Sequence, residues 1–500
     1  MKGFPANLAE RPDHRALVAG DRSLSYRELH ERGSRLAHAL RALGVEEGDR
    51  LAVMLPNGIP FVEAMAAAAK IGVATVTLNW HLRPDEVAWI LDDSGARALV
   101  TEERLRPQVE AVAGERSVPV VWYGDGDPPG MTAAASDDLP YRWPTSWPVL
   151  YTSGTSGRPK GVVHNAQAVP EIMEMTQDML AGMWGYRPDD VHIAAGPLYH
   201  AGPSGYANVT LYLGGTVVLM EGWDAQRFFE LVEAERVTTT FLTPAHMIRL
   251  LELPEATWRA HDLTSLRHVI HAGAPCPVDV KHGFIEALPQ AEVWELYGAS
   301  EGGATRVSSA EWLERPGTVG LPWPGVELRI LDAEDGEPVA TGEDGVVWVA
   351  PPQGRFEYHN DPEKTEAAWR DGAFSVGDIG HLDDDGYLYL TDRLSDMLIR
   401  AGVNVYPREI EDVLHGHPDV VDCAVFGIPH DRDGEHPMAV VEVRGATTVD
   451  ELRAWCAERL DPYKVPTDIE LIDELPRDPN GKVLKRHLRD RAWAGTGRAI

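Results

Sequence analysis

Apolar residues change their spacing repeatedly over the first hundred positions, and the changes predict helices that alternate with strands. After Ser25-Tyr-Arg-Glu28, a sequence typical of a helix N-terminus, leucines recur at helical spacing from residue 29 to residue 43. Strands that alternate with helices are typical of parallel βαβ layers. The predicted elements after that helix are a strand at 51–55, a helix at 60–70, a strand at 73–78, a helix that opens at Pro84 and a strand at 98–100.

Closer to the C-terminus the pattern predicts a hairpin and then a new unit. Apolar positions at 379–382 and 387–390 flank Asp383-Asp-Asp-Gly386, a turn sequence that ends in glycine. Beyond it, the spacing predicts a helix at 407–414 and strands at 420–426 and 438–443.

The chain is therefore expected to fold as two domains. Five hundred residues exceed what one hydrophobic core usually serves. The pattern starts afresh after a polar stretch near Ser395. We expect an N-terminal domain of residues 1–394 and a C-terminal domain of residues 395–500.

Composition and charge narrow the class of protein. The apolar fraction of 44% and the charged fraction of 25% are ordinary for a soluble globular chain. A formal net charge of −32 argues against nucleic acid, whose binding rests on phosphate neutralisation, and against an anionic membrane surface. Glu63 and Lys70 interrupt the longest apolar region, so no membrane span is predicted.

The cysteines and the N-terminus favour a cytoplasmic location. Cys276, Cys423 and Cys456 are too few and too far apart for a disulfide framework or a zinc knuckle. Thiols of this kind are typical of a reducing compartment. The first residues hold no apolar core of signal-peptide length.

The stretch from Tyr151 to Gly161 has the composition of a polyphosphate-binding loop. Glycines let backbone amides approach an anion, successive N–H groups form a concave seat for it, and Lys160 adds a positive charge. The stretch is not a Walker A motif, because Lys160 precedes a glycine and no hydroxyl follows it. The alternative is a flexible Gly/Ser turn. The candidate phosphate-binding residues are Thr152, Ser153, Gly154, Thr155, Ser156, Gly157 and Lys160.

Two further stretches suggest a nucleotide site. Apolar Val293-Trp294 leads into a predicted turn at Tyr297-Gly298, where Tyr297 could stack on a nucleobase and Glu301 could bind Mg²⁺. Asp378 follows a glycine turn, and a carboxylate can accept hydrogen bonds from both hydroxyls of a ribose. The alternative for each stretch is a turn exposed to solvent.

A basic cluster lies at 479–486, near the end of this acidic chain. It includes Lys482. A lysine near a C-terminus is usually solvated. The alternative is an ammonium that stabilises charge developing on a phosphoryl group.

Together, and in this order, the four motifs resemble those of the adenylate-forming superfamily, which includes acyl-CoA synthetases, carrier-protein-loading adenylation domains and luciferases. The signature loop of that superfamily, Ser-Gly-Thr-Thr/Ser-Gly-x-Pro-Lys-Gly, is matched from Ser153 to Gly161. The resemblance spans nearly the whole chain. It implies an α/β multidomain fold with layered βαβ sheets, helices and a small barrel-like part in a large N-terminal domain. It also implies a small, mobile α+β C-terminal domain that carries the catalytic lysine.

The resemblance also assigns roles to residues. It implies that Lys482 is catalytic, that Tyr297 lies on adenine, that Glu301 binds Mg²⁺, and that Asp378 and Arg393 reach the ribose and phosphates. Within the nucleotide motifs, Ser300 and Val376 replace threonines, and Glu295 stands where Asn or Gln is frequent, which leaves its contact with adenine open. Ser395 also departs, because the superfamily usually has Asp or Lys at the hinge. The remaining implied ATP-binding residues are Gly273, Ala274, Pro275, Glu295, Gly298 and Ser300.

The same resemblance makes His200, which ends Gly196-Pro-Leu-Tyr-His200, a second candidate catalytic residue, next to the substrate carboxylate and the path of the thiol. The alternative is a core or surface histidine. No aspartate lies between Ala194 and Leu213 to bind an α-ammonium, so an amino acid is disfavoured. Small apolar residues leave volume and favour a bulky apolar acid (fatty, aromatic or polycyclic), and the alternative is close backbone packing. The candidate acyl-pocket residues are His200, Tyr206, His271, Ala272, Gly273, Ala299 and Gly302.

By resemblance, the expected activity is that of an AMP-forming acyl-CoA ligase. Such an enzyme uses ATP, Mg²⁺ and coenzyme A, and its C-terminal domain rotates about a hinge that corresponds to Ser395. Arg400, Ala401 and Gly402 would then line the path of CoA. Two alternatives remain: an acyl-AMP ligase that loads an acyl carrier protein, and a non-catalytic nucleotide-binding protein on this fold.

Overall fold

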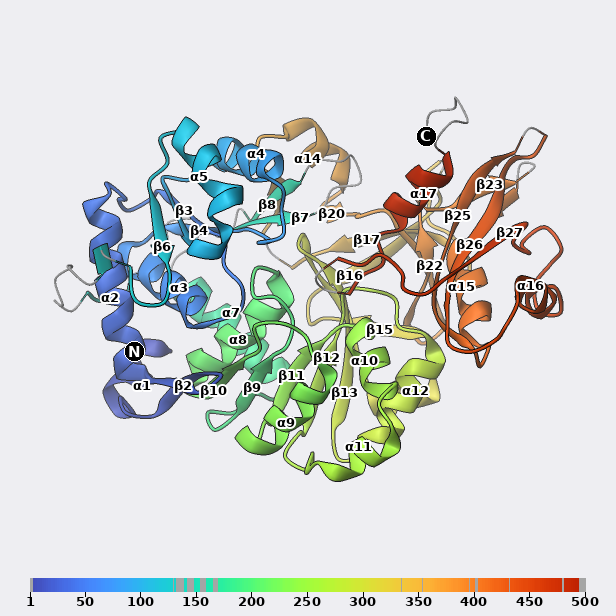
Figure 1. The fold of residues 1–500 in the computed structure, drawn as a ribbon. Helices are drawn as coiled ribbons and strands as arrows, with labels where there is room; N and C mark the ends of the chain where they lie inside the picture. Colours follow the sequence, from blue (N-terminus) through green and yellow to red (C-terminus); the bar gives the residue numbers. More distant parts are fainter. Residues whose placement is uncertain are drawn as a thin grey trace.

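The computed structural model describes residues 3–128, 130–131, 139–141, 148–152, 159–164, 170–333, 335–352, 354–394, 396–400, 403–430, 432–478 and 481–493. A large N-terminal part carries two sheets, and a small C-terminal part carries a third (Figure 1). The expected α/β architecture, with a large and a small domain, is therefore confirmed. Within the described ranges, no helix combines the length and the apolar content that a membrane span requires.

The first sheet has seven strands in the order β18-β8-β7-β4-β3-β5-β6, and its four pairings among β7, β4, β3, β5 and β6 are parallel. Alternate residues of β3 face opposite layers: Leu51 packs in the core with α2 and α3, whereas Ala52 packs in the core with α4 and α5. The elements are α1 (Phe4–Glu10), α2 (Tyr26–Ala42), β3 (Arg50–Val53), α3 (Ile59–Ile71), β4 (Ala74–Thr77), α4 (Pro84–Ser94), β5 (Ala98–Glu102), a 3₁₀ turn (Glu103–Leu105), α5 (Arg106–Glu115), β6 (Val120–Tyr123), β7 (Val149–Thr152), β8 (Lys160–His164) and β18 (Phe356–Tyr358).

The alternation predicted for the first hundred residues is confirmed in this sheet. Ser25 caps α2 in a capping box with Glu28, and Pro84 opens α4. The predicted strands and helices lie within a few residues of their observed bounds.

The second sheet has 15 strands and joins a parallel portion to an antiparallel one. In the parallel portion, β10, β9, β11, β12 and β13 lie side by side, with α9, α10 and α12 packed on one face and α7 and α8 on the other. The elements are β1 (Arg15–Ala19), β2 (Arg22–Ser25), α7 (Pro170–Met183), β9 (Val191–Ala194), α8 (Ala201–Leu213), β10 (Thr216–Leu219), α9 (Ala225–Glu235), β11 (Thr239–Leu242), α10 (Pro244–Leu251), α11 (Glu255–Ala260), β12 (His268–His271), α12 (Val278–Ala287), β13 (Glu292–Ala299), β14 (Gly302–Ser308) and α13 (Ser309–Glu314).

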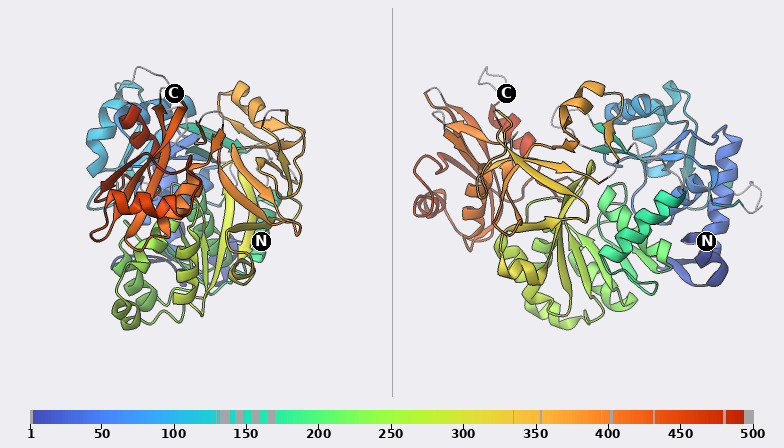
Figure 2. Two further views of the ribbon diagram at one scale, coloured as in Figure 1. Left: turned by 90° about the vertical axis from the view of Figure 1, so that its right-hand side faces the viewer. Right: turned by 180° about the vertical axis from the view of Figure 1, so that it is seen from behind.

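The antiparallel portion of the second sheet follows the parallel portion along the chain. It contains the predicted hairpin, with β21 and β22 paired on either side of Asp383. The C-terminal part stands beside this portion in both views of Figure 2. The elements are β15 (Thr318–Pro322), β16 (Glu327–Leu331), β17 (Gly345–Ala350), α14 (Pro362–Ala368), β19 (Trp369–Arg370), β20 (Ala373–Phe374), β21 (Asp378–Leu382) and β22 (Leu388–Arg393).

The C-terminal part is a five-stranded sheet with helices on both faces. Val425 packs with α15 and α16, whereas its neighbour Phe426 packs with α17. The third sheet has the order β24-β23-β26-β25, and β27 pairs with β26. The elements are β23 (Leu398–Arg400), β24 (Val403–Val405), α15 (Pro407–His415), β25 (Val420–His430), β26 (Gly434–Val443), α16 (Val449–Ala457), β27 (Asp468–Ile472) and α17 (Lys485–Trp493).

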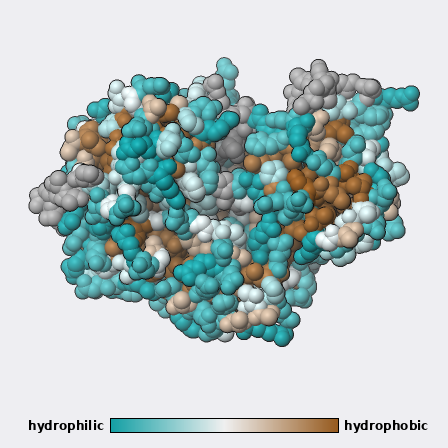
Figure 3. All heavy atoms as spheres, in the orientation of Figure 1, coloured by the Kyte–Doolittle hydropathy of each residue, from teal (hydrophilic) through white to brown (hydrophobic). Residues whose placement is uncertain are grey.

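The surface is mainly hydrophilic, and the cysteines lie in the interior. Most of the face shown in Figure 3 is hydrophilic, and a hydrophobic area lies over the C-terminal part. All three cysteines are buried as free thiols. Burial raises the pKa of Cys423 and Cys456 to about 11, and it raises the pKa of Cys276 further.

Candidate active site

One end of the site is built where β13, β21 and β22 meet. The Tyr297 hydroxyl donates to Oδ2 of Asp378 at 2.7 Å, and Nε of Arg393 donates to Oδ1 of the same carboxylate at 3.0 Å. Asp378 and Arg393 are opposite each other in the β21–β22 ladder, so the hairpin fixes their pairing. The predicted ribose-binding residues are thus together, and the aromatic ring of Tyr297 lies with them.

The local geometry predicted at Tyr297 was wrong. A turn was predicted at Tyr297-Gly298, but β13 continues through both residues, and the chain reverses at Ser300 and Glu301. The two strands approach so closely that a Cβ on Gly298 would lie 2.9 Å from the Gly302 carbonyl oxygen. Glycine therefore serves close strand pairing here rather than a turn.

Basic and acidic groups converge at the tip of the β13–β14 hairpin. Tyr358 donates its hydroxyl to Glu301 at 2.9 Å, and the ammonium of Lys160 lies 5.2 Å from the centre of the Tyr358 ring. A ring nitrogen of His164 lies 3.0 Å from the carbonyl oxygen of Ser300, so β8 is tied to this tip. Burial and the adjacent Lys364 lower the pKa of Lys160 to about 8.

Two ammonium groups side by side form a site that an anion would stabilise. Lys160 and Lys364 repel each other, and a polyphosphate between them would relieve that repulsion. Glu301 offers carboxylate oxygens beside them, and Mg²⁺ prefers such oxygens. The donors present therefore fit an ATP–Mg²⁺ complex.

Lys482, which belongs to the C-terminal part, lies near the same site. Burial and the nearby guanidinium of Arg393 lower the pKa of Lys482, while Asp378 and Asp396 lie close enough to oppose that effect. A Cβ on Gly481 would lie 2.6 Å from the Cβ of Ala245, so the turn that holds Lys482 packs against α10 of the large part. The candidate catalytic lysine and the candidate ribose site are brought together.

His200 is the N-cap residue of α8. Asn57, just before α3, fixes the loop that leads to His200. The Asn57 side chain donates to the Gly196 carbonyl at 2.9 Å and accepts from the Leu198 N–H at 2.8 Å. Burial lowers the pKa of His200 to about 4, so its imidazole is neutral at pH 7. Burial and then Asp478 of the C-terminal part raise the pKa of the adjoining Tyr199, so this loop also faces the C-terminal part.

Aromatic side chains surround the predicted acyl wall. Tyr206 on α8 stacks on Phe241 and on Tyr186, with ring centroids 5.3 and 5.9 Å away. Ala272, just after β12, belongs to the same apolar cluster, together with Trp184 and Trp294. Gly273 is left-handed, with φ of 91°. The remaining small residue of the wall on β14, Gly302, faces the ring of Phe374, which a Cβ would approach to 3.0 Å.

Glu295 lies in a buried ion pair. Its Oε2 accepts from Nζ of Lys281 at 2.6 Å and lies 3.8 Å from Nε2 of His271, and all three side chains are less than one-tenth exposed. Burial alone would raise the pKa of Glu295, but Lys281 and His271 hold it below its usual value. Lys281 also lies 4.8 Å from the centre of the Trp312 ring. Glu295 is therefore already paired within the fold. A contact with adenine, which the sequence left open, would have to share its carboxylate with this ion pair.

Several predicted residues lie outside the described ranges. These are Ser153, Gly154, Thr155, Ser156 and Gly157 of the phosphate loop, Ser395 of the hinge, and Ala401 and Gly402 of the CoA path. Arg400 is described, at the end of β23, and its guanidinium donates to the Tyr463 carbonyl at 2.5 Å. Of the other candidates, Thr152 ends β7, Ala299 ends β13, and Ala274 and Pro275 follow β12.

Sequence reasoning missed residues that contact the candidates across long separations. Lys364 lies in the first turn of α14, which Asp361 caps, so the sequence signals a helix start there. Nothing in the sequence signals that Lys364 lies next to Lys160. Tyr358 and Lys281 likewise lie in no motif that names a partner.

A second group of possible metal ligands lies in the C-terminal part. His430, Asp433 and His436 have ligand atoms within 4.8 Å of one another. The imidazoles of His430 and His436 stack with ring centroids 3.6 Å apart. Two imidazoles that bind one zinc ion at Zn–N distances of about 2.1 Å instead point away from each other in a tetrahedral arrangement. Asp433 already accepts from His436 at 2.7 Å, so the arrangement is that of a stacked pair with a carboxylate partner.

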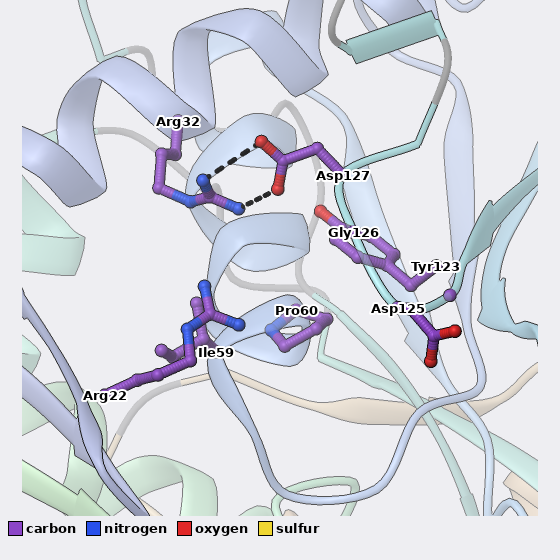
Figure 4. Close-up of a pocket in the computed structure, with 9 residues that line it drawn as sticks. Arg22, Arg32, Ile59, Pro60, Tyr123, Asp125, Gly126 and Asp127 are labelled. Carbon is purple, nitrogen blue, oxygen red and sulfur yellow. Dashed lines mark hydrogen bonds and ion pairs between the residues drawn. The ribbon is translucent and has the colours of Figure 1, made fainter.

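Cavities lined by described residues also open on the large part. One, of about 310 Å³, is lined by Arg32, Asp127 and Tyr123, and Figure 4 shows Arg32 turned toward Asp127. Arg32 also pairs with the buried Glu63, so its charge is already compensated. The other cavity, of about 320 Å³, borders Gly377 and Leu394, next to the ribose-end residues.

Acid should destabilise this protein, because several of its histidines have lowered pKa values in the folded state. Burial lowers the pKa of five of them to about 3 or 4, whereas the unfolded chain titrates near 6.5. Below pH 6.5 the unfolded state therefore binds protons that the folded state does not, so stability falls as pH falls. His415 acts in the opposite direction, because Cys423 and Asp422 raise its pKa despite burial. The five are His192, His200, His246, His268 and His271.

We expect the free energy of unfolding to drop by about 3 kcal/mol between pH 7 and pH 6. Melting temperatures measured at pH 7.5, 6.5 and 6.0 would report the drop. Replacing the exposed His282 with glutamine should leave this pH dependence unchanged. Equal melting temperatures at pH 7.5 and 6.0 would contradict the expectation.

Comparison with known proteins agrees with this geometry. The family model "AMP-binding enzyme" matches residues 4–358, and the model "AMP-binding enzyme C-terminal domain" matches residues 409–482. The chain is 36% identical to a feruloyl-CoA synthase of an Amycolatopsis species, over 98% of this chain and 99% of that protein. It is 34% identical to the fatty acid–[acyl-carrier-protein] ligase ScoC of Streptomyces coeruleorubidus, over 98% and 95%. Among solved structures, ATP-bound MatB from Rhodopseudomonas palustris has a TM-score of 0.87 at 29% identity, over 98% and 99% of the two chains.

Proposed function

Because this chain belongs to the family of AMP-binding enzymes, we propose that it is an ATP-dependent ligase that joins a bulky apolar carboxylic acid to the thiol of CoA. The observation that carries the proposal is the meeting of Lys482, from the C-terminal part, with Arg393 and Asp378 of the large part. An ammonium and a guanidinium that lie close together attract an anion, and a nucleotide phosphate would supply one.

The first half-reaction forms an acyl-adenylate. A carboxylate oxygen of the acid forms a bond to the α-phosphorus of ATP, and the bond from that phosphorus to the pyrophosphate oxygen breaks. Charge builds on the non-bridging oxygens in a loose, in-line transition state. Lys482 stabilises that charge more than it stabilises the ground state.

The ribose and the phosphates are held at opposite ends of the site. Asp378 has about four acceptor positions, and Tyr297 and Arg393 occupy one each, so ribose hydroxyls can use the others. Lys160 and Lys364 bind the phosphates that leave. Glu301 would hold Mg²⁺, which would neutralise charge on the phosphates.

Replacing Glu301 with glutamine should raise the Mg²⁺ concentration that gives half-maximal adenylation by about tenfold, because one ionised ligand is lost. The amide oxygen can still accept from Tyr358, so the fold should persist. Pyrophosphate release measured across a Mg²⁺ titration would test this.

The matched control is Glu357, the neighbour of Tyr358 on β18, whose exposed side chain points to the opposite face of the strand. Its replacement by glutamine should leave the Mg²⁺ curve unchanged. If the two variants gave the same curve, Glu301 would not be the metal ligand.

The second half-reaction transfers the acyl group. The CoA thiol gives its proton to water, and its sulfur forms a bond to the acyl carbonyl carbon. The bond from that carbon to the bridging oxygen breaks, and AMP leaves with this oxygen. The neutral imidazole of His200 can donate a hydrogen bond to the substrate carboxylate and later to the acyl carbonyl. Because it is uncharged, it does not neutralise the negative charge of the attacking group. The C-terminal part would rotate about Ser395 between the two steps, and Arg400, Ala401 and Gly402 would line the route of CoA.

The aromatic cluster around Tyr206 and the small residues from Ala272 to Ala274 support an apolar acid. Burying an apolar tail there contributes about 0.8 kcal/mol per CH₂. The two relatives named above act on a feruloyl and a fatty acyl group, and one of them uses a carrier protein. A carrier-protein acceptor is therefore the alternative to CoA, and a non-catalytic nucleotide-binding protein is the alternative of another class.

One experiment tests acid and acceptor together. A panel of fatty, aromatic and polycyclic acids would be incubated with ATP and Mg²⁺, with CoA, a carrier protein bearing phosphopantetheine, or no acceptor. Mass spectrometry of the thioester identifies acid and acceptor. Absence of acid-dependent ATP–pyrophosphate exchange with every acid would favour the non-catalytic alternative.

A further inference from the structure

The side chain of Arg477 contacts the backbone directly before Lys482. Within the turn, the Lys482 N–H donates to Oδ1 of Asp478 at 2.9 Å, and the Gly481 N–H donates to the Asp478 carbonyl at 2.8 Å. From outside, one terminal nitrogen of Arg477 donates to the Gly481 carbonyl at 3.0 Å. That carbonyl belongs to the peptide unit that ends at the nitrogen of Lys482, so Arg477 fixes the backbone directly before the lysine.

Arg477 is itself held rigidly. Its other terminal nitrogen contacts Oδ2 of Asp422 at 2.8 Å and Oε2 of Glu442 at 3.2 Å. All three side chains are less than 15% exposed. Charge-assisted bonds in a dry environment leave a guanidinium little freedom, and its planar fork lets it serve a carbonyl and two carboxylates at once.

Glu442 also contacts the large part. Its Oε1 lies 3.4 Å from a terminal nitrogen of Arg249 on α10, while its Oε2 accepts from the Leu475 N–H at 3.0 Å. The Lys482 turn packs on the same helix, at Ala245. One helix of the large part therefore contacts both the turn and the carboxylate that anchors Arg477.

We propose that Arg477 is a positioning residue for Lys482, and that the Arg249–Glu442 pair links this positioning to closure of the C-terminal part on α10. The proposal rests on the adenylation function proposed above. When the C-terminal part rotates away, Glu442 leaves Arg249, and the lysine turn leaves Ala245. Arg477 then acts in the adenylation arrangement and has no part in transfer to the thiol.

Arg477→Lys separates positioning from stability. A lysine keeps the charge beside Asp422 and Glu442, but its single nitrogen cannot also reach the Gly481 carbonyl. We expect its melting temperature to stay near that of the wild type, and acid-dependent ATP–pyrophosphate exchange to fall about 10- to 100-fold through kcat, with little change in KM for ATP. Thioester formation from supplied acyl-adenylate and CoA should remain within about twofold.

The matched control is Arg491→Gln, which removes an exposed ion pair with Glu470 in the same part of the chain. It should leave both half-reactions unchanged. Normal exchange by Arg477→Lys, or an equal loss in both half-reactions, would overturn the proposal. A wild-type enzyme without any exchange would instead refute the adenylation function itself, so the two failures are distinguishable.

Arg249→Gln tests the link to closure. It should lower exchange severalfold and spare thioester formation. Because both arginines act through Glu442, the double variant with Arg477→Lys should lose less than the product of the two single losses. Fully multiplicative losses would show that the two arginines act independently and would overturn the link.

Discussion

Lys482→Ala is expected to lower acid-dependent ATP–pyrophosphate exchange by about 10²- to 10³-fold, the usual loss when one preorganised charge-stabilising group is removed. Thioester formation from supplied acyl-adenylate should change far less, because we propose that this step uses a rotated arrangement of the C-terminal part. Exchange by the wild type should also decline at high pH, since the ammonium must be charged. Burial and Arg393 lower the pKa of Lys482, so the decline should begin below the pH at which a solvated lysine titrates.

The control is Lys464→Ala, another lysine of the C-terminal part, paired with Glu409 at 2.7 Å. It should retain both half-reactions. Comparable losses in the two half-reactions of Lys482→Ala would remove Lys482 from its proposed role.

Lys281→Met should lower the free energy of unfolding by about 3–5 kcal/mol, because it leaves Glu295 as an uncompensated buried charge. Methionine keeps the length and apolar contacts of the lysine stem. In the wild type, the lowered pKa of Glu295 contributes stability above the pH at which an unfolded glutamate titrates, and this stability is lost as pH falls through the folded pKa. In the variant, Glu295 can take up a proton more readily, so the deficit should shrink toward pH 5. Thermal melting at pH 7.5 and pH 5 would measure both effects.

The double variant Lys281→Met with Glu295→Gln removes both charges. It should recover most of the lost melting temperature, because replacing a whole buried pair costs much less than breaking it. A single variant as stable as the wild type at pH 7.5 would show that the pair is not the buried charge compensation described above.

The sequence predicted the order of elements well where local signals and packing agree. Ser25 with Glu28 and Pro84 marked helix starts that the structure retains, and the strand at 73–78 was visible because both of its faces are buried. The turn predicted at Tyr297-Gly298 failed because a glycine signals a turn and close strand pairing equally. The pairing with β14, which no local signal encodes, decides between them.

The sequence named most candidate site residues but few of their partners. Tyr297, Asp378 and Arg393 stand in motifs, so their shared role could be inferred before their contacts were known. Lys364 beside Lys160 and Lys281 beside Glu295 could not, because each pairing arises from how sheets and helices stack. Arg477 lies only five positions before Lys482, yet its importance depends on Asp422 and Glu442 from two other strands.

The burial of all three native thiols makes this chain a convenient object for labelling. A maleimide dye reacts with exposed thiolates, and Cys276, Cys423 and Cys456 offer none at neutral pH. One engineered cysteine on α5 and another on α16 would therefore carry a fluorophore pair without any native cysteine having to be removed. Energy transfer between the two dyes could then test the proposed rotation of the C-terminal part in real time.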